Sequence, residues 1–158
     1  MSERLVHLAA RIRDELTELD HIADRVSEAW GRALSVGDDY YLDSVALNLH
    51  GFYSGLERIF ELIAATVDNA RPKGENWHKA LLEQMSVEIA GLRPAAISED
   101  TLQRLADYRG FRHIVRNVYA HHFEADRLQK LVAGLPDILA QVRAELQAFA
   151  DFLEQQSS

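Results

Sequence analysis

The stretch YYLDSVALNLHGFYSGLERIFELIAATVD, residues 40–68, decides the fold class. Apolar residues recur in it at steps of three and four, which is the spacing of one face of an α-helix. A second apolar face lies beside the first, and a helix that is apolar over so wide an arc is typical of the centre of a bundle. Gly51 and Gly55 lie one turn apart and predict the close approach of another helix. The two faces consist of Val45, Leu49, Phe52, Leu56, Ile59, Ile63 and Val67, and of Leu42, Ala46, Tyr53 and Phe60.

Helical periodicity continues on both sides of this stretch. Heptad spacing predicts a long helix over residues 3–35 that ends at Gly37. A short helix is expected over 77–90, before a Gly-Leu-Arg-Pro stop. Ser98 is expected to cap a further helix that runs to about Val118.

The last helical region is expected to be broken near Gly134, with Pro136 in the first turn of its continuation. No stretch reads as a strand. The sequence therefore predicts an all-α, up-and-down bundle of four main helices plus a short one, forming a single domain over residues 1–158.

Composition narrows the functional classes. The chain contains no cysteine, which excludes disulfides, thiolate metal sites and a thiol nucleophile. No apolar run approaches the roughly 20 residues of a membrane span, and the N-terminal segment lacks the pattern of a secretory signal. We therefore expect a cytoplasmic protein without a membrane partner.

The charge is unevenly distributed along the chain. The formal net charge is −8, from 17 basic and 25 acidic residues. Residues 104–130 contain six basic and three acidic side chains, hence +3, which leaves −11 for the remainder. A uniformly acidic surface repels nucleic acid, whereas this polarised chain predicts a narrow anion site and no general binding to DNA.

Arg109, Arg112 and Arg116 lie three and four residues apart and predict a basic edge that binds RNA phosphates. The alternative is a solvated face with salt bridges to neighbouring helices. The sequence that follows, Arg116-Asn117-Val118-Tyr119-Ala120-His121-His122-Phe123, favours the functional interpretation. Arginine offers a fork of donors to phosphate and histidine exchanges protons near neutral pH, so the pair has the chemistry to cut a phosphodiester without metal.

In such a reaction His121 deprotonates a ribose 2′-hydroxyl or protonates the leaving oxygen, and Arg116 holds the phosphate as charge builds. Residues five apart on a continuous helix point about 140° away from each other. Either the helix ends near Val118 and the chain turns His121 back, or two protomers contribute. His122 is the candidate for the second acid–base group within one protomer.

The Arg116-x4-His121 spacing, with Asn117 after the arginine, resembles the signature of the HEPN superfamily, and Arg-Asn-Val-Tyr-Ala-His is similar to the HepT-like ribonuclease toxins. The resemblance extends over about residues 41–153. It implies a HEPN-like helical bundle, a homodimer whose two motifs line a shared cleft, and metal-independent endoribonuclease activity without a cofactor. It places Arg116 and His121 as the catalytic pair and Asn117 as the polar position of the motif. The implied partner is a minimal nucleotidyltransferase antitoxin.

One position departs from the HepT-like pattern. There the motif commonly continues His-x-Tyr, and the antitoxin modifies this tyrosine with AMP, whereas this chain has Phe123. Because Phe123 lacks a hydroxyl, modification at this position is chemically impossible. Tyr119 lies nearby, but its spacing matches the apolar stripe and favours a packed side chain. Neutralisation by binding alone is one alternative, and a differently controlled branch of the family is the other.

The pairs Glu18/His21 and Glu75/His78 have the Glu-x-x-His spacing of di-iron bundles. The first falls outside the inner heptad positions and the second begins in a turn, so we expect no metal site. His50 is interpreted as a core or edge histidine, and the role of His113 is left open. Both tryptophans, Trp30 and Trp77, are expected to pack and not to stack on bases.

A second hypothesis assigns the same bundle a non-enzymatic role. In it, the basic edge of a catalytically inactive HEPN module docks a minimal nucleotidyltransferase or a nucleotide. Phe123 favours this alternative, and the intact Arg116 and His121 argue against it. A purely structural scaffold explains the heptads but not the polarised charge.

Overall fold

The computed structural model describes residues 2–117 and 125–156 of the chain. Within these two ranges there are helices and connecting turns but no strand, which confirms the predicted all-α class. The helical elements are α1 (Ser2–Val36), α2 (Asp39–Ile63), the π-helical turn η1 (Ala64–Asp68), α3 (Trp77–Met85), α4 (Glu99–Asn117) and α5 (Ala125–Gln156).

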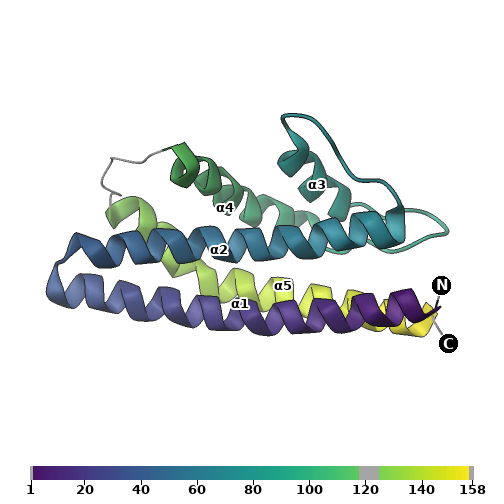
Figure 1. Ribbon diagram of the computed structural model, residues 1–158, viewed down its shortest axis with the longest axis horizontal. Helices are drawn as coiled ribbons and strands as arrows, with labels where there is room; N and C mark the ends of the chain where they lie inside the picture. The colour runs from purple at the N-terminus through teal and green to yellow at the C-terminus, as the bar shows by residue number, and fades with distance from the viewer. Residues whose placement is uncertain (1, 118–124, 157–158) are drawn as a thin grey trace.

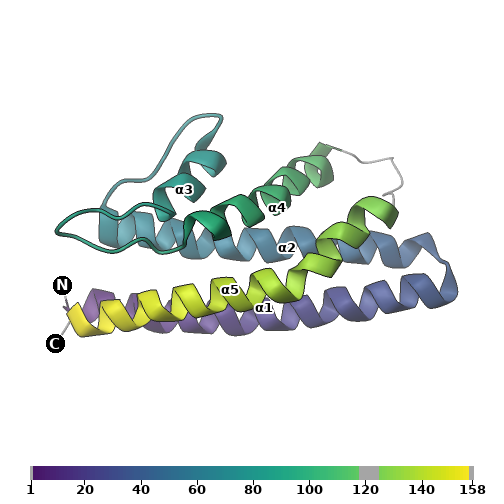
Figure 2. The same ribbon diagram turned by 180° about the vertical axis from the view of Figure 1, so that it is seen from behind.

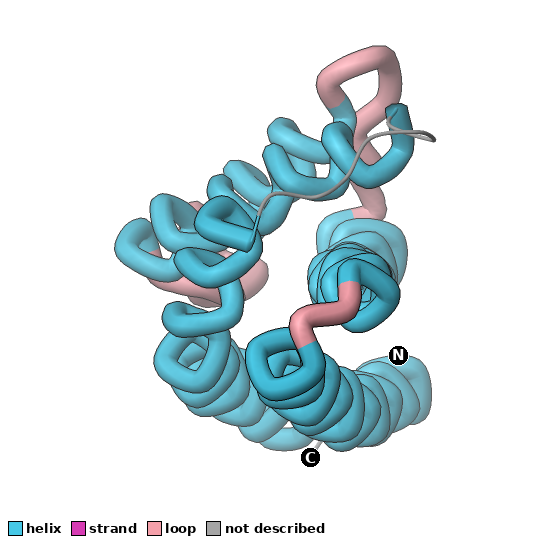
Figure 3. Tube along the Cα trace, turned by 90° about the vertical axis from the view of Figure 1, so that its left-hand side faces the viewer, coloured by secondary structure: helices cyan, strands magenta, loops and turns pink. Residues whose placement is uncertain are grey.

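The four long helices alternate in direction. Helices α1 and α2 form an antiparallel pair, α5 returns along α1, and α4 crosses the opposite side of α2 (Figures 1 and 2). The short α3 lies over the later part of α2, on the same side as α4. The end view in Figure 3 shows the long helices arranged around the interior that the buried side chains fill. This is the predicted up-and-down bundle of four main helices and a short one.

Helix α2 is central, as its wide apolar arc predicts. It contacts α1, α3, α4 and α5, and Phe52, Leu56 and Ile59 on it are completely buried. A Cβ atom at Gly55 would lie 2.7 Å from Leu19 Cδ2 of α1, so any larger residue at this position requires the Leu19 side chain to shift. At Gly51 the nearest atom would be 4.0 Å away, which is ordinary contact. Close approach is thus confirmed at Gly55 but not required at Gly51.

Two predicted helix starts and ends are confirmed. Gly37 ends α1 with a φ of 71°, a left-handed conformation that favours glycine. Ser98 caps α4, because the Thr101 amide donates a hydrogen bond to Ser98 Oγ at 3.1 Å. None of the helices within the described ranges combines the length and apolarity that a membrane crossing requires.

The short helix ends earlier than predicted, at Met85 instead of residue 90. After Met85 the chain turns back, and the amides of Ala96 and Ile97 donate hydrogen bonds to the Met85 carbonyl at 2.9 and 3.1 Å. The Arg93 side chain closes this turn from within, donating to the carbonyls of Gln84, Val87 and Pro94. These tertiary bonds satisfy carbonyls that another helical turn would otherwise satisfy.

The predicted break near Gly134 is wrong, because α5 is one helix that contains Pro136. Proline removes one intrahelical hydrogen bond and bends a helix without necessarily ending it. Accordingly, the first part of α5 is inclined to the rest of the helix (Figure 2). The first part contacts α4 through Leu131, whose carbonyl accepts a 2.7 Å hydrogen bond from Tyr108 Oη. The later part is joined to α1 by ion pairs, which link Arg13 to Asp151 and Glu154, and Arg143 to Asp20.

Candidate functional site

The sequence motif begins in the last turn of α4. Arg116 and Asn117 are the last two residues of α4 that the structure describes, and the predicted end near Val118 falls at the edge of the undescribed segment. Their side chains, like those of Arg112 and His113, are outside the described part of the structure. His121, His122 and Phe123, together with Tyr119, lie in segment 118–124, outside the described residues. The geometry of the Arg116/His121 pair therefore stays a prediction.

The helix that carries the motif is held firmly on both sides. Leu105, Tyr108 and Phe111 are buried, as their spacing predicts. The Tyr108 ring packs edge-on against Phe52 of α2, with ring centroids 5.6 Å apart, while its hydroxyl donates to Leu131 of α5. Burial, and to a lesser degree the nearby Asp107 carboxylate, raise the pKa of Tyr108 above its usual value. Tyr108 is thus a neutral donor that fixes α4 between α2 and α5.

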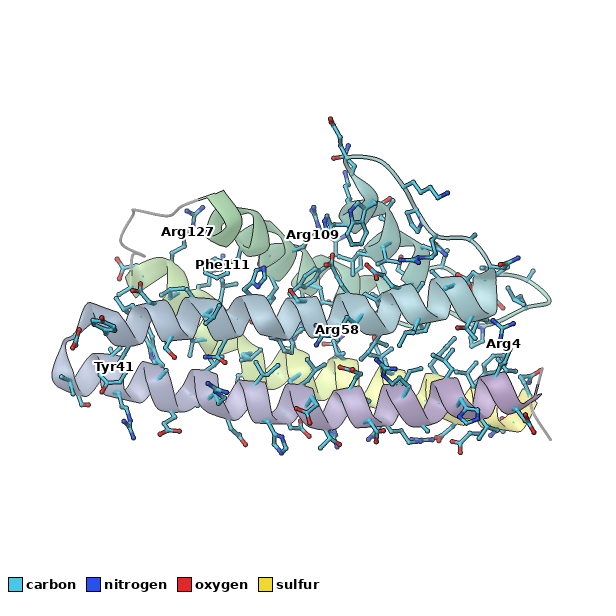
Figure 4. All side chains as sticks on the ribbon, viewed as in Figure 1. Arg4, Tyr41, Arg58, Arg109, Phe111 and Arg127 are labelled. Carbon is cyan, nitrogen blue, oxygen red and sulfur yellow. The ribbon has the colours of Figure 1, made fainter. Side chains whose placement is uncertain are left out.

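Arg109 is the one member of the predicted basic edge whose side chain is described. It is half-buried, and it lies where α4 passes close to α3 (Figure 4). Its Nε atom is buried and has no hydrogen-bond partner among the described residues. A buried N–H without an acceptor costs about 1–3 kcal/mol, so this position favours an incoming acceptor. The Arg109 side chain is therefore less exposed to solvent than a basic edge on the surface would be.

The other basic side chains of the 104–130 segment differ in their surroundings. Arg104 forms an ion pair with Asp100 at 3.1 Å, one turn earlier on α4. Arg127 and Lys130 are exposed on the first two turns of α5, and neither has an ion-pair partner in the part of the chain that the structure describes. The positive charge that stays free to meet an anion is therefore on α5 as well as on α4.

A pocket of about 400 Å³ lies between α4 and α5. Its α4 wall includes Asp107, Gly110 and Phe111, and its α5 wall includes Arg127, Lys130 and Leu131. In Figure 4 the Arg127 side chain extends from α5 toward α4. Segment 118–124, which contains His121, connects the same two helices. The basic groups on α5 thus lie on the helix that follows the motif in the sequence, across the pocket from the helix on which the motif begins.

A second pocket, of about 300 Å³, lies beside α3 and includes Glu61, Arg71, Lys73 and Trp77. Arg71 forms an ion pair with Glu61 at 3.5 Å. Trp77 is partly buried and packs against the core, as does Trp30, which confirms their predicted packing role. This pocket is remote in sequence from the arginine and histidine motif.

Two contacts of buried carboxylates, Glu57 with His78 and Asp68 with Arg93, were not expected from the sequence. Oε2 of Glu57 on α2 lies 2.6 Å from His78 Nδ1, at hydrogen-bond distance, and the Glu57 side chain is 5% exposed. Asp68 and Arg93, at 1% and 0%, form a two-point contact at 2.5 and 2.8 Å. The signal for the first was a single glutamate within the apolar face of residues 40–68. His78 therefore pairs with Glu57, and not within the Glu75-x-x-His78 spacing.

Among the described residues, no three histidine or acidic side chains lie close enough to hold a metal ion. His50, on α2, is partly buried, in line with its interpretation as a core or edge histidine.

Comparison with known proteins supports the resemblance seen in the motif. No curated protein and no solved structure matches the chain. A family model described as "HepT-like protein" matches residues 44–153, which include α4, the motif and most of α2 and α5. Because this match extends over more than half of the sequence, the chain belongs to the HepT-like family of HEPN-type proteins.

Proposed function

We propose that the protein is a metal-independent endoribonuclease and the toxin of a toxin–antitoxin pair. The observation that carries the proposal is the Arg116-Asn117-Val118-Tyr119-Ala120-His121 sequence, which begins in the last turn of α4 in a chain of the HepT-like family. Arg116 and His121 form the catalytic pair, with Asn117 as the polar position of the motif. His122 and the arginines of α4 assist in binding the phosphate.

The reaction is an internal transfer at phosphorus. The ribose 2′-oxygen attacks the adjacent phosphorus after losing its proton to a general base, and the 5′-oxygen of the next nucleotide leaves after receiving a proton from a general acid. His121 performs one of these proton transfers, and Arg116 stabilises the charge on the phosphoryl oxygens. The products are a 2′,3′-cyclic phosphate and a free 5′-hydroxyl. Because all of these groups are side chains, cleavage should proceed in EDTA.

The second acid–base group comes from a second protomer in this proposal. A homodimer that joins two motifs in one cleft supplies an arginine and a histidine from each chain. The partner that neutralises the toxin is a minimal nucleotidyltransferase. Because Phe123 cannot accept AMP, we propose that neutralisation rests on binding, which a basic surface on the partner would favour against a chain of net charge −8.

The test compares the wild type with Arg116→Ala and His121→Ala on end-labelled single-stranded RNA in EDTA. We expect cleavage by the wild type, little or none by either variant, and a cyclic phosphate on the 5′ fragments. Exposed residues of α1 provide matched controls, Arg32→Ala and His21→Ala, which should cleave as the wild type does.

Equal cleavage by the wild type and both motif variants would overturn the assignment. A wild type that does not cleave, but forms a stable complex with a minimal nucleotidyltransferase, would instead favour the inactive docking module. Light scattering that detects only a monomer at micromolar concentration would count against the shared cleft.

A further inference from the structure

We infer that the pocket between α4 and α5 binds one nucleotide of the RNA strand a few nucleotides from the cleaved bond, with Arg127 and Lys130 on its phosphate and Asp107 on its base or ribose. This inference rests on the proposed ribonuclease function, and it assigns a binding role to residues outside the arginine and histidine motif. The pocket volume of about 400 Å³ lies within the range of small-molecule sites, roughly 300–1,000 Å³.

The charges in the pocket match a nucleotide better than a lone phosphate. Arg127 and Lys130 are three residues apart on α5, so they lie on one face, and no described acid neutralises them. Asp107 stands on the α4 wall and accepts hydrogen bonds only, from amino, imino or hydroxyl groups. A free phosphate offers no such donors and would be repelled by Asp107. A nucleotide presents its phosphate to one wall and its donors to the other.

Gly110 lines the pocket without a side chain. A Cβ atom at this position would meet no atom within 4 Å, although the residue is in the middle of a helix. Glycine in a helix interior costs about 1 kcal/mol relative to alanine. Tyr108 and Leu131, joined by their 2.7 Å hydrogen bond, fix the two walls at this level. The pocket is therefore a defined space, and its α4 wall is backbone alone at Gly110.

The pocket is also at the correct distance from the motif. Gly110 precedes Arg116 by six residues, which is about 9 Å along a helix axis. This length corresponds to two or three nucleotides at the roughly 3.4 Å rise of a stacked strand. A strand held at Arg116 therefore reaches the pocket with a nucleotide close to the cut.

The first experiment removes the two cations. The double variant Arg127→Ala/Lys130→Ala is compared with Arg32→Ala/Lys79→Ala, which removes the same charges from exposed positions on α1 and α3. We expect the KM for cleavage of a single-stranded oligoribonucleotide to rise on the order of tenfold in the first variant, with kcat little changed, because the charge-assisted hydrogen bonds to phosphate are absent. The slope of log affinity against log salt should fall by about 0.7 for each phosphate that the variant no longer neutralises.

The second experiment fills the pocket without removing charge. Gly110→Leu places a side chain in the open space, and Gly31→Leu is the matched control, since a Cβ at that helical glycine also meets nothing within 4 Å. We expect Gly110→Leu to raise KM and Gly31→Leu to leave it unchanged, with both variants at least as stable to urea as the wild type.

RNA binding measured in the His121→Ala variant, which should not cleave, separates this inference from the proposed function. In this variant the affinity for RNA is read without cleavage of the substrate. If the wild type does not cleave, but RNA binding still weakens on removal of Arg127 and Lys130, the pocket stands and the nuclease assignment falls. If the wild type cleaves and neither the double variant nor Gly110→Leu changes KM or the salt slope, the pocket assignment is wrong. If no RNA binds to the wild type, both are wrong.

Discussion

The buried ion pair between Asp68 and Arg93 predicts a large decrease in stability when its acid is neutralised. Asp68 accepts from Nε and from one terminal nitrogen of Arg93, at 2.5 and 2.8 Å, and both side chains are essentially unexposed. The remaining hydrogen-bond capacity of Arg93 is directed to the carbonyls of Gln84, Val87 and Pro94. Asp68→Asn leaves this guanidinium buried without a counter-charge, and it preserves the shape of the side chain.

Breaking a buried pair on one side costs about 3–5 kcal/mol. The three carbonyls and one amide oxygen still solvate Arg93 in Asp68→Asn, so we expect about 3 kcal/mol, the lower end of this range. For a chain of this length, 1 kcal/mol corresponds to about 2–4 °C in Tm, which gives a decrease of roughly 6–12 °C. Urea unfolding followed by circular dichroism measures the free energy, and a thermal scan measures Tm.

Glu28→Gln is the matched control, because Glu28 pairs with Arg32 at 3.0 Å on the surface of α1. An exposed pair of this kind contributes less than about 1 kcal/mol. An Asp68→Asn protein that is destabilised no more than Glu28→Gln would refute the argument that the turn after α3 depends on a buried charge pair.

Three further predictions follow from contacts within the bundle. Gly55→Ala should lower the free energy of unfolding in urea, because the new Cβ would lie 2.7 Å from Leu19. Gly31→Ala, whose Cβ meets nothing within 4 Å, should raise it by about 1 kcal/mol. Equal effects of the two substitutions would contradict the close approach at Gly55. Tyr108→Phe should lower the free energy of unfolding by about 1 kcal/mol, because it removes the hydrogen bond to the Leu131 carbonyl. An unchanged urea midpoint would contradict this. Folding raises the pKa of the Tyr108 hydroxyl. The stabilisation that this hydroxyl gives to the fold is therefore complete below its pKa in the unfolded chain, about 10, and is lost as the pH rises further. Stability should therefore fall more steeply above pH 10 in the wild type than in Tyr108→Phe.

Periodicity was sufficient to locate the helices, and it also gave those helix boundaries that depend on local chemistry. Gly37 and Ser98 act at their own positions, one by its left-handed φ and the other by its side-chain cap, so both boundaries are readable from the sequence. The end at Met85 depends on Arg93 and on amides eleven and twelve residues later. Contacts of that range leave no periodic signal in the sequence, and the predicted helix was too long.

Of the candidate site, the sequence predicts the motif but not the pocket. The motif from Arg116 to His121 is recognisable by residue type and spacing, and it lies within the range that the family model matches. In the sequence, Arg127 and Lys130 are visible only as part of a charge count, because the pocket that they line with Asp107 forms where two helices meet. Sequence spacing does not specify how far apart two helix faces lie, and therefore it does not specify a pocket.

The bend in α5 has a mechanical consequence for the proposed nucleotide pocket. Residues after Pro136 are anchored to α1, whereas Arg127 and Lys130 precede the bend and meet α4. Pro136 does not line the pocket, yet it sets the angle at which one wall approaches the other. A straighter α5 would carry both cations along an arc away from α4 while the rest of the bundle stayed in place. The aperture of the pocket is thus set by a residue outside its lining, and under the proposed function a change at Pro136 alters RNA affinity from a distance.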